Sequence, residues 1–506
     1  MQHKQGEDRN QMFMFSLESA IASDSFVRVV DVFVDAIDLK SFGFAHVECE
    51  EEGRPPYHPS ALLKLYLYGY RYGIRTTRKL EREAQTNIEA MWLLSGLRPK
   101  YKTIADFRKN HSKAFREVFR RFVCLLKEWK LIEGETVAID SFKIRGSNSL
   151  KNNFNERKLK HHLDYIENQI KEYEALLDAN DKTEDKKELE KKIEERKEKQ
   201  AKYEQIKTAL VESGEEQISL TDPDSRSVIL HKNIINVGYN IQASSDAKHK
   251  LLVEYDTGEV NDTHALAPIA LQTKEILGVE SMKVLADKGY HTGVQLKECE
   301  DNGISTYVSP RDPSPQAEGL YTNTMFHYSK ETDTYTCPAG STLTTHGRWY
   351  RHSESRKGRK TRVYYFKRYN TPDCKTCAQR NKCTKSKHKV RNIDRSEYAE
   401  IIEANNQRVT QKPDYYRQRQ QVTEHMFGTL KRQRGFTHTL VRKKDNVLGE
   451  VGLMFIGYNL SRCISILGAE RLIKMLKEHL HLFKDLIRTI TSLFEGKNIP
   501  ELKMVI

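Results

Sequence analysis

The spacing of apolar and polar positions changes several times along this chain, and each change predicts a different kind of element. Residues 10–130 carry apolar side chains every three or four positions, as at 60–70 and 115–123, which predicts a set of short helices. Pro59 suits the first turn of the helix that follows it. Exposed Arg and Lys on these helices favour a helix-turn-helix-like DNA reader; the alternative is a helical packing domain with a solvated basic face.

Short apolar runs with β-branched residues begin after Gly134 and predict the strands of an α/β core. A helix capped by residues 261–264 separates two of these strands, and Pro413 opens a late helix that carries Glu424. This order predicts a mixed sheet with helices around it. The predicted strands lie at 134–140, 237–260 (a hairpin), 283–287 and 305–309.

Two insertions interrupt this core. Residues 151–215 are dense in charge, and apolar residues recur at helical spacing on both sides of a polar turn at Asn180, which predicts an antiparallel helical hairpin. Such a segment is usually a solvated spacer or partner surface; a DNA clamp or dimer contact is the alternative. Residues 320–392 are rich in Thr, Tyr and Cys and predict a β-rich module.

The patterns divide the chain into seven segments. In chain order they are a helical DNA-binding domain (1–132), the first part of the core (133–150), a helical-hairpin insertion (151–217), the continued core (218–318), a β-rich, zinc-ribbon-like cysteine insertion (319–393), the core helix with Glu424 (394–440) and C-terminal helices (441–506).

The charge balance is basic, because 84 Lys and Arg stand against 70 Asp and Glu and leave a formal charge of +14. This balance favours a polyanionic partner such as DNA; a soluble protein with excess lysine is the alternative. The first residues lack the apolar stretch of a secretory signal. Residues 451–462 contain Asn459 and Arg462 and indicate a buried core helix rather than a membrane span. We therefore expect a cytoplasmic, nucleoid-associated protein with reduced thiols and no membrane contact.

Four of the eight cysteines gather in one stretch, and their spacing suits a structural zinc site. Cys374 and Cys377 form a C-x2-C pair, Cys383 follows soon after, and Cys337 precedes them at an irregular distance. Four thiolates can close a tetrahedral zinc shell. Four free or paired structural cysteines are the alternative.

Three acidic residues occur in contexts that suit metal ligands for phosphoryl chemistry. Asp140 and Asp287 each end an apolar run and are expected at strand ends, whereas Glu424 lies on a polar helix face. Carboxylates placed together repel one another unless cations join them, and two Mg²⁺ ions about 4 Å apart resolve that repulsion. Arg417, Glu424 and Lys431 recur every seven residues, so we expect them on one helical face beside a phosphate backbone. For each residue alone, an ordinary strand end or a surface helix with charge pairs is the alternative.

An ordered set of short motifs resembles the DDE-type transposases of bacterial insertion sequences. The closest resemblance is to insertion-sequence family eleven-eighty-two, a relative of the branch whose last helix carries a Tyr-Arg-Glu-Lys signature. The resemblance covers about residues 12–466. Its pieces are residues 57–63, 137–141, 221–225, 237–242, 285–290, 337–340 and 422–428, with Lys431.

The resemblance implies an RNase H-like core in which Asp140, Asp287 and Glu424 are catalytic and hold two Mg²⁺ or Mn²⁺ ions. It also implies binding to terminal inverted repeats, hydrolytic cleavage, and transfer of the 3′-OH strand into target DNA. The implied partners are double-stranded DNA, at the transposon ends and at the target, and a second copy of the chain in a homodimer that synapses two ends. The implied phosphate and DNA contacts are Lys431, Arg417, Arg419, Tyr416 and Lys288.

One position departs from the related signature, because Gln420 stands where its arginine would be, and Arg417 or Arg419 would have to substitute. Two other functions remain open. One is an RNase H-fold nuclease that hydrolyses DNA without strand transfer. The other is a domesticated, non-catalytic DNA-binding protein, which loss of an acidic residue would indicate; all three acidic residues are present.

Overall fold

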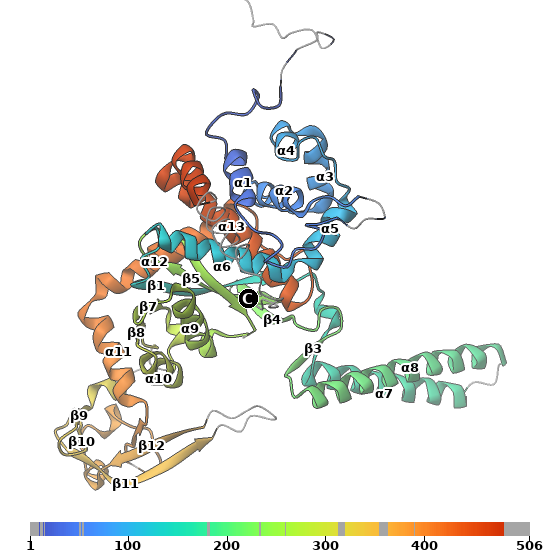
Figure 1. Cartoon of the computed structure of the whole chain (residues 1–506). Coiled ribbons are helices and arrows are strands. Elements are labelled where there is room, and N and C mark those ends of the chain that lie inside the picture. The colour runs from blue at the N-terminus through green and yellow to red at the C-terminus, as the bar shows by residue number, and fades with distance from the viewer. Residues whose placement is uncertain are drawn as a thin grey trace, which may run out of the picture.

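Within the residues that the structure describes, six helices form the N-terminal part of the chain, as the helical spacing predicts (Figure 1). The computed structural model describes residues 10, 14, 16–49, 52, 55–179, 183–231, 234–258, 260–311, 319–353, 363–388 and 390–479. Pro59 occupies the first turn of its helix, as predicted, and the Asn87 side chain caps α4 by accepting from the amides of Glu89 and Ala90. The helices are α1 (Phe26–Asp35), α2 (Pro59–Arg71), α3 (Thr77–Thr86), α4 (Ile88–Leu93), α5 (Tyr101–Asn110) and α6 (Ser112–Glu128).

A mixed sheet lies next to these helices, which confirms the predicted α/β core. Its order is β4-β5-β1-β7-β8. Strand β4 pairs with the first part of β5, and β6 pairs with the second part. Strands β1, β7 and β8 run parallel, whereas β4, β5 and β6 pair antiparallel. The strands are β1 (Thr136–Arg145), β4 (Arg226–His231), β5 (Ile234–Asp246), β6 (Leu252–Thr257), β7 (Met282–Ala286) and β8 (Ile304–Val308).

Helices cover this sheet, namely α9 (Leu266–Leu277), α10 (Gly293–Asp301), α11 (Ala399–Gln411) and α12 (Pro413–Phe427). The predicted side-chain cap at residues 261–264 is wrong. Asp262–His264 form a short 3-10 turn, and α9 begins only after Ala265, without a side-chain cap. The reason is tertiary, because the Asp262 carboxylate bonds to the amide groups of Asn240 and Gln242 on β5 instead.

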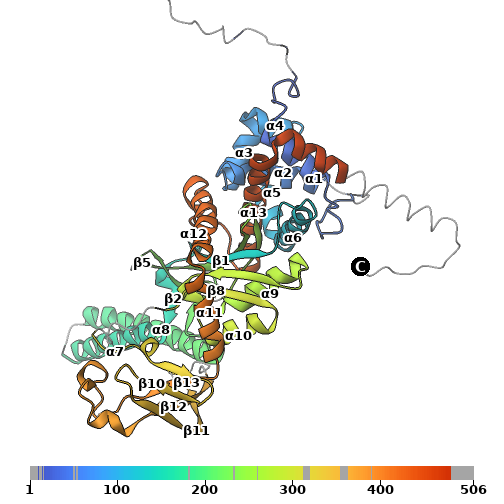
Figure 2. The ribbon, with the colours of Figure 1, turned by 90° about the vertical axis from the view of Figure 1, so that its left-hand side faces the viewer.

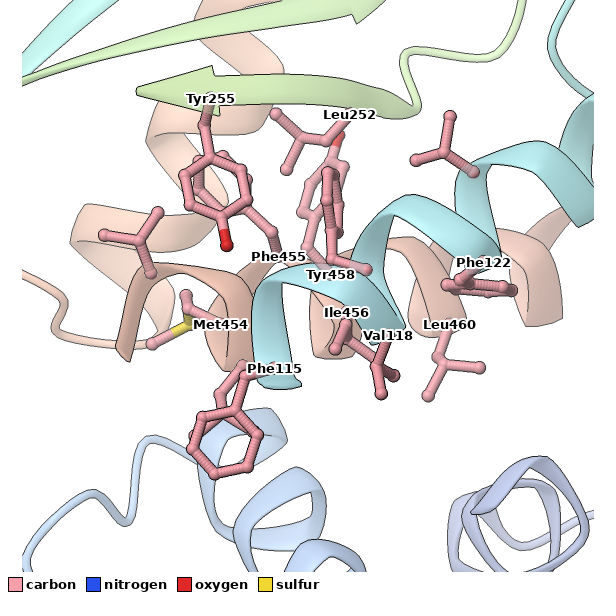
Figure 3. Close-up of a cluster of buried hydrophobic side chains, with 14 of the residues drawn as sticks. Phe115, Val118, Phe122, Leu252, Tyr255, Met454, Phe455, Ile456, Tyr458 and Leu460 are labelled. Atoms are coloured by element: carbon pink, nitrogen blue, oxygen red, sulfur yellow. The ribbon is translucent and has the colours of Figure 1, made fainter. Parts of the chain in front are cut away.

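The helix α13 (Lys444–Leu467) passes between the N-terminal helices and the sheet, and its burial confirms the predicted core helix. Phe455 packs on Tyr255 of β6 at 5.0 Å between ring centroids (Figure 3). Gly452 permits this approach, since a Cβ there would lie 2.4 Å from the Tyr255 hydroxyl. Asn459 donates to and accepts from the Leu252 backbone at 2.9 Å, so the polar residue inside the helix pairs with the edge of β6.

Within the described residues, no single helix is long and apolar enough to cross a membrane. Helix α13 and the following helix Ala469–His479 meet that test only as a pair, and the two are bent by 113°. Residues 480–496, the rest of the predicted helical tail, lie outside the part of the chain that the structure describes.

Both insertions take the predicted secondary structure. Helices α7 (Glu156–Ala179) and α8 (Thr183–Ser213) form an antiparallel arm that projects from the core, and strands β2 (Asn153–Asn155) and β3 (Gln217–Ser219) pair at its base (Figure 1). The cysteine-containing insertion is a separate antiparallel sheet of order β13-β12-β11-β10-β9, and α11 leads from it back to the core (Figure 2). Its strands are β9 (His327–Ser329), β10 (Thr334–Thr336), β11 (Thr342–Ser353), β12 (Val363–Asn370) and β13 (Ile393–Ser396).

Candidate active site

The two aspartates of the predicted trio lie side by side. In the parallel ladder of β1 and β7, Ile139 pairs with Ala286. Asp140 and Asp287 are the residues that directly follow this pair, one after each partner. Neighbouring strands are about 4.8 Å apart, which brings the two carboxylates within reach of a shared cation. The position of Asp287 directly after β7 agrees with the prediction, and its side chain accepts from the Lys288 amide at 2.6 Å.

Asp140 is not at a strand end, contrary to the prediction. Strand β1 continues to Arg145, because its second half pairs with β5 as far as Gly238 after β7 has ended. Asp140 therefore lies in mid-strand, where one neighbouring strand stops. Because β7 pairs with β1 only as far as Ile139, the backbone of β1 has no β7 partner from Asp140 onward.

The Asp140 carboxylate is held by two donors. Arg419 Nη1 donates to Oδ2 at 3.0 Å, and the Ser141 amide donates to Oδ1 at 2.8 Å. Burial raises the pKa of Asp140 to about 6, against the lowering effects of Arg419 and Ser141, and the charges of Asp287 and Asp262 raise it further. A buried carboxylate beside two others disfavours its own charge, and a bound cation relieves this cost.

Helix α12 lies across β1 and β7, in the position predicted for it. The Tyr415 hydroxyl and the Thr136 hydroxyl lie 2.7 Å apart, and the Tyr416 hydroxyl donates to the Ala286 carbonyl at 3.3 Å. Val422 packs with apolar side chains of both strands. These contacts place Tyr416 and Arg419 beside the two aspartates.

Arg419 and Arg417, the two candidates for the signature arginine, lie in different environments. The Arg419 side chain is 13% exposed and pairs with Asp140, whereas the Arg417 side chain is 73% exposed and pairs with Asp414 at 3.0 Å on the surface. Gln420 is exposed. Of the two, Arg419 is therefore the arginine that reaches the aspartate pair.

The prediction that Arg417, Glu424 and Lys431 share one helical face is wrong for Lys431. After Phe427 the helix changes to a π-helical segment, Gly428–Gln433, whose wider turn rotates the later residues. Lys431 Nζ lies 5.6 Å from the centre of the Phe142 ring on β1. Burial lowers the pKa of Lys431, and Asp140 raises it. Lys431 therefore faces the strand that carries Asp140.

Glu424 is exposed on α12, and the structure does not bring it together with the aspartates. Among the described residues, no group of three or more His, Cys, Asp or Glu is close enough to hold a metal ion. The donor set nevertheless fits Mg²⁺ or Mn²⁺, because these ions prefer carboxylate oxygens and complete their shells with water and phosphate.

The sequence analysis missed a third aspartate near this pair. Asp262 Oδ1 accepts from Asn240 and from Gln242, each at 2.9 Å. A Cβ on Gly289 would lie 3.4 Å from the other oxygen of Asp262, so the carboxylate abuts the loop that follows Asp287. The fully buried Tyr290 hydroxyl donates to Gln242 and anchors the same loop. No local pattern marks Asp262, because its partners come from a distant strand.

Lys288 is exposed directly after Asp287, and its proposed DNA contact stays a prediction. The four clustered cysteines meet at one pocket of the β-rich insertion, together with Pro338 and Arg391. Burial raises the pKa of the Cys383 thiol; Arg391 lowers it, and the other three thiols raise it. All four cysteines are free, so the pocket contains no disulfide.

Two family models match segments of the chain. Residues 15–110 match the family model of a transposase domain (DUF772), and residues 336–464 match that of a transposase DDE domain; Asp140 and Asp287 lie outside both segments. No curated protein matches the chain. A solved piggyBac transposase synaptic complex with hairpin DNA is 11% identical, with a TM-score of 0.32 over 94% of this chain and 82% of that one. The two matched domains support a DDE-type DNA transposase.

Proposed function

We propose that this protein is a transposase that binds the terminal inverted repeats of an insertion sequence, cleaves DNA beside them by hydrolysis and joins the freed 3′-OH to target DNA. The observation that carries the proposal is the register of β1 and β7, which sets Asp140 beside Asp287. Helix α12, packed over both strands, brings Arg419 to Asp140 and carries Glu424. The same arrangement is the basis for proposing an RNase H-like core of the family-eleven-eighty-two type.

In this mechanism Asp140, Asp287 and Glu424 would hold two Mg²⁺ or Mn²⁺ ions. Glu424 lies on α12, the helix that also carries Arg419, and would complete this ligand set. When bound, the ions supply an activated attacking oxygen and stabilise the leaving oxygen. Arg419, which donates to Asp140 in this structure, would contact a backbone phosphate beside the aspartate pair.

Three further cations are proposed as contacts to the DNA backbone. Lys431, Lys288 and the exposed Arg417 contact phosphates near the cleaved end. The N-terminal helices bind the repeat sequence, and synapsis of two ends requires a homodimer. Tyr416 keeps α12 in register with β7 through its bond to the Ala286 carbonyl.

Purified protein is expected to cleave a duplex that carries the inverted repeats flanking its own gene when Mg²⁺ is present, and to lose this activity in EDTA. Pre-cleaved ends incubated with a target plasmid are expected to give joined product, read on a gel. Cleavage without joining under any metal would favour the nuclease, and binding with neither reaction would favour the non-catalytic DNA-binding protein.

We also propose that the four-cysteine pocket holds one structural Zn²⁺. Cys337, Cys374, Cys377 and Cys383 line it from three turns. Soft thiolates select zinc, and a shell completed by four protein ligands leaves no open position for catalysis. Within the described residues the four thiols do not form a metal-binding group; they belong to surface turns rather than to packed strands, so they would be able to approach a bound ion.

Metal analysis of the purified full chain is expected to find about one zinc per chain, and Cys374→Ser is expected to remove it because three thiolates hold zinc less tightly than four. The matched control is Cys49→Ser, an exposed cysteine outside the pocket, which should keep the zinc. If wild-type protein expressed with zinc in the medium contains no zinc after purification, this site is refuted.

A further inference from the structure

The outer half of the β11–β12 ribbon exposes aromatic side chains that no core covers. Trp349 is 49% exposed, Tyr350 36% and Tyr365 45%. The small core of the insertion lies at the other end of the ribbon and consists of Phe326, Tyr335, Leu343, Tyr369 and Ile393. Large exposed aromatic side chains on a projecting element are typical of a binding surface.

The two faces of this ribbon differ. On one face Tyr350 and Phe366 form a cross-strand stack at 5.6 Å, with Arg368 over both rings. Cross-strand aromatic pairs of this kind stabilise a two-stranded ribbon, which accounts for that face. The opposite face carries Trp349 and Tyr365, and neither ring stacks on another aromatic ring within the described residues.

Trp349 and Tyr365 are diagonal neighbours on their face. Trp349 pairs with Lys367 across the strands, and Arg351 pairs with Tyr365, so the four side chains alternate between ring and cation. Diagonal positions are about 7–8 Å apart. Each ring therefore offers a separate stacking platform with a positive charge beside it.

The charges on this face suit an anionic polymer. Arg351 is exposed, and within the described part of the chain no ion pair or hydrogen bond to its side chain occurs. Lys367 Nζ lies 5.5 Å from the centre of the Trp349 ring and 2.9 Å from Asp333 Oδ2. Aromatic platforms interleaved with cations bind single-stranded nucleic acid, because the rings stack on bases and the cations contact phosphates.

We propose that this face of the ribbon, formed by Trp349, Arg351, Tyr365 and Lys367, binds unpaired nucleotides of the DNA substrate by stacking. The bases must be unpaired, since a base inside a duplex has both faces covered by its neighbours. The proposal deepens the proposed function and depends on it for the identity of the polymer as DNA. The ribbon acts as a second DNA contact, separate from the carboxylates of the core (Figure 1).

Tryptophan fluorescence tests this proposal directly. The chain has three tryptophans, so Trp92→Phe with Trp129→Phe leaves Trp349 as the only one. Three DNAs are compared in EDTA: a single strand, a duplex with an unpaired tail and a blunt duplex of the same length. Stacking is expected to quench Trp349 with the first two DNAs and not with the blunt duplex.

Affinity measurements on full-length variants give a second readout. Trp349→Ala is expected to weaken binding of the tailed duplex by about tenfold and to leave blunt-duplex binding unchanged, because stacking on one base contributes on the order of a tenfold factor or more. Trp349→Phe keeps a stacking face and is expected to retain most of the affinity. The control is Tyr165→Ala, which removes an equally exposed aromatic ring from α7, where Tyr165 is 52% exposed.

Three results would overturn the proposal: no quenching by any unpaired DNA, an equal loss of affinity for tailed and blunt duplexes, or a change of oligomeric mass in Trp349→Ala, which would assign the face to a second copy of the chain. Cleavage by the wild-type protein is measured separately. Cleavage without quenching would refute only the ribbon site, whereas quenching without cleavage or joining would refute only the transposase.

Discussion

Asp140→Asn is expected to reduce cleavage of end DNA by at least about a thousandfold in Mg²⁺, because the variant removes a metal ligand from the reacting centre. Binding of the inverted repeat is expected to stay within about twofold of the wild type, since Asp140 lies in the core sheet and not on the N-terminal helices. Cleavage is read by gel and binding by mobility shift on the same duplex.

The same variant separates lost chemistry from lost folding. Burial holds the pKa of Asp140 at about 6 in the metal-free protein, above its usual value near 3.9. A raised pKa means that the folded state disfavours the charged form. The resulting cost is absent below about pH 4, grows as the pH rises to 6 and is complete above that.

In EDTA at pH 7.5, Asp140→Asn is therefore expected to melt no lower than the wild type, because the neutral amide avoids this cost and can still accept from Arg419. Asp414→Asn is the matched control: its carboxylate is 91% exposed and pairs with Arg417, and its cleavage rate should not change. Wild-type cleavage by Asp140→Asn would show that the aspartate is not catalytic.

Glu450→Ala is expected to destabilise the protein by about 3–5 kcal/mol, the usual cost of removing one partner from a buried ion pair. Glu450 is fully buried on α13. Its Oε1 accepts from the Tyr70 hydroxyl at 3.1 Å and lies 3.5 Å from Arg75, and Arg108 is 3.9 Å away. Its Oε2 accepts from the Leu440 amide at 2.9 Å.

The cost is large because two buried guanidinium groups lose their counter-charge, and Arg75 and Arg108 are only 5% and 6% exposed. The measurement is the urea unfolding midpoint, followed by fluorescence and circular dichroism. Glu470→Ala, an exposed glutamate in the next helix, should change the free energy of unfolding by less than about 0.5 kcal/mol. Equal midpoints for Glu450→Ala and the wild type would contradict the role assigned to this contact.

Part of the candidate site could be predicted from local patterns. Asp287 directly follows the short, mainly apolar run Met282–Ala286, which was predicted to be a strand and forms β7. Asp140 was predicted as an acidic residue of the core, but not in mid-strand, because the length of β1 depends on its pairing with β5. Local spacing places Arg419 on the late helix, but its partner Asp140 is 279 residues away, so the pairing itself is not predicted. Asp262 was not singled out as a site residue, because its position depends on a bond to Asn240, 22 residues away on β5.

The sequence by itself determined the kinds of element: the helical N-terminal part, the strands around Asp140 and Asp287, the helical arm and a buried late helix. Each follows from periodicity, which is a local property of the chain. Tertiary structure alone decided that α13 lies between the N-terminal helices and the sheet, with Glu450 facing two arginines. It also decided that the π-helical turn directs Lys431 to β1. These outcomes depend on burial and charge pairing between segments far apart in the sequence. The pattern of residues within one helix or strand therefore does not predict them.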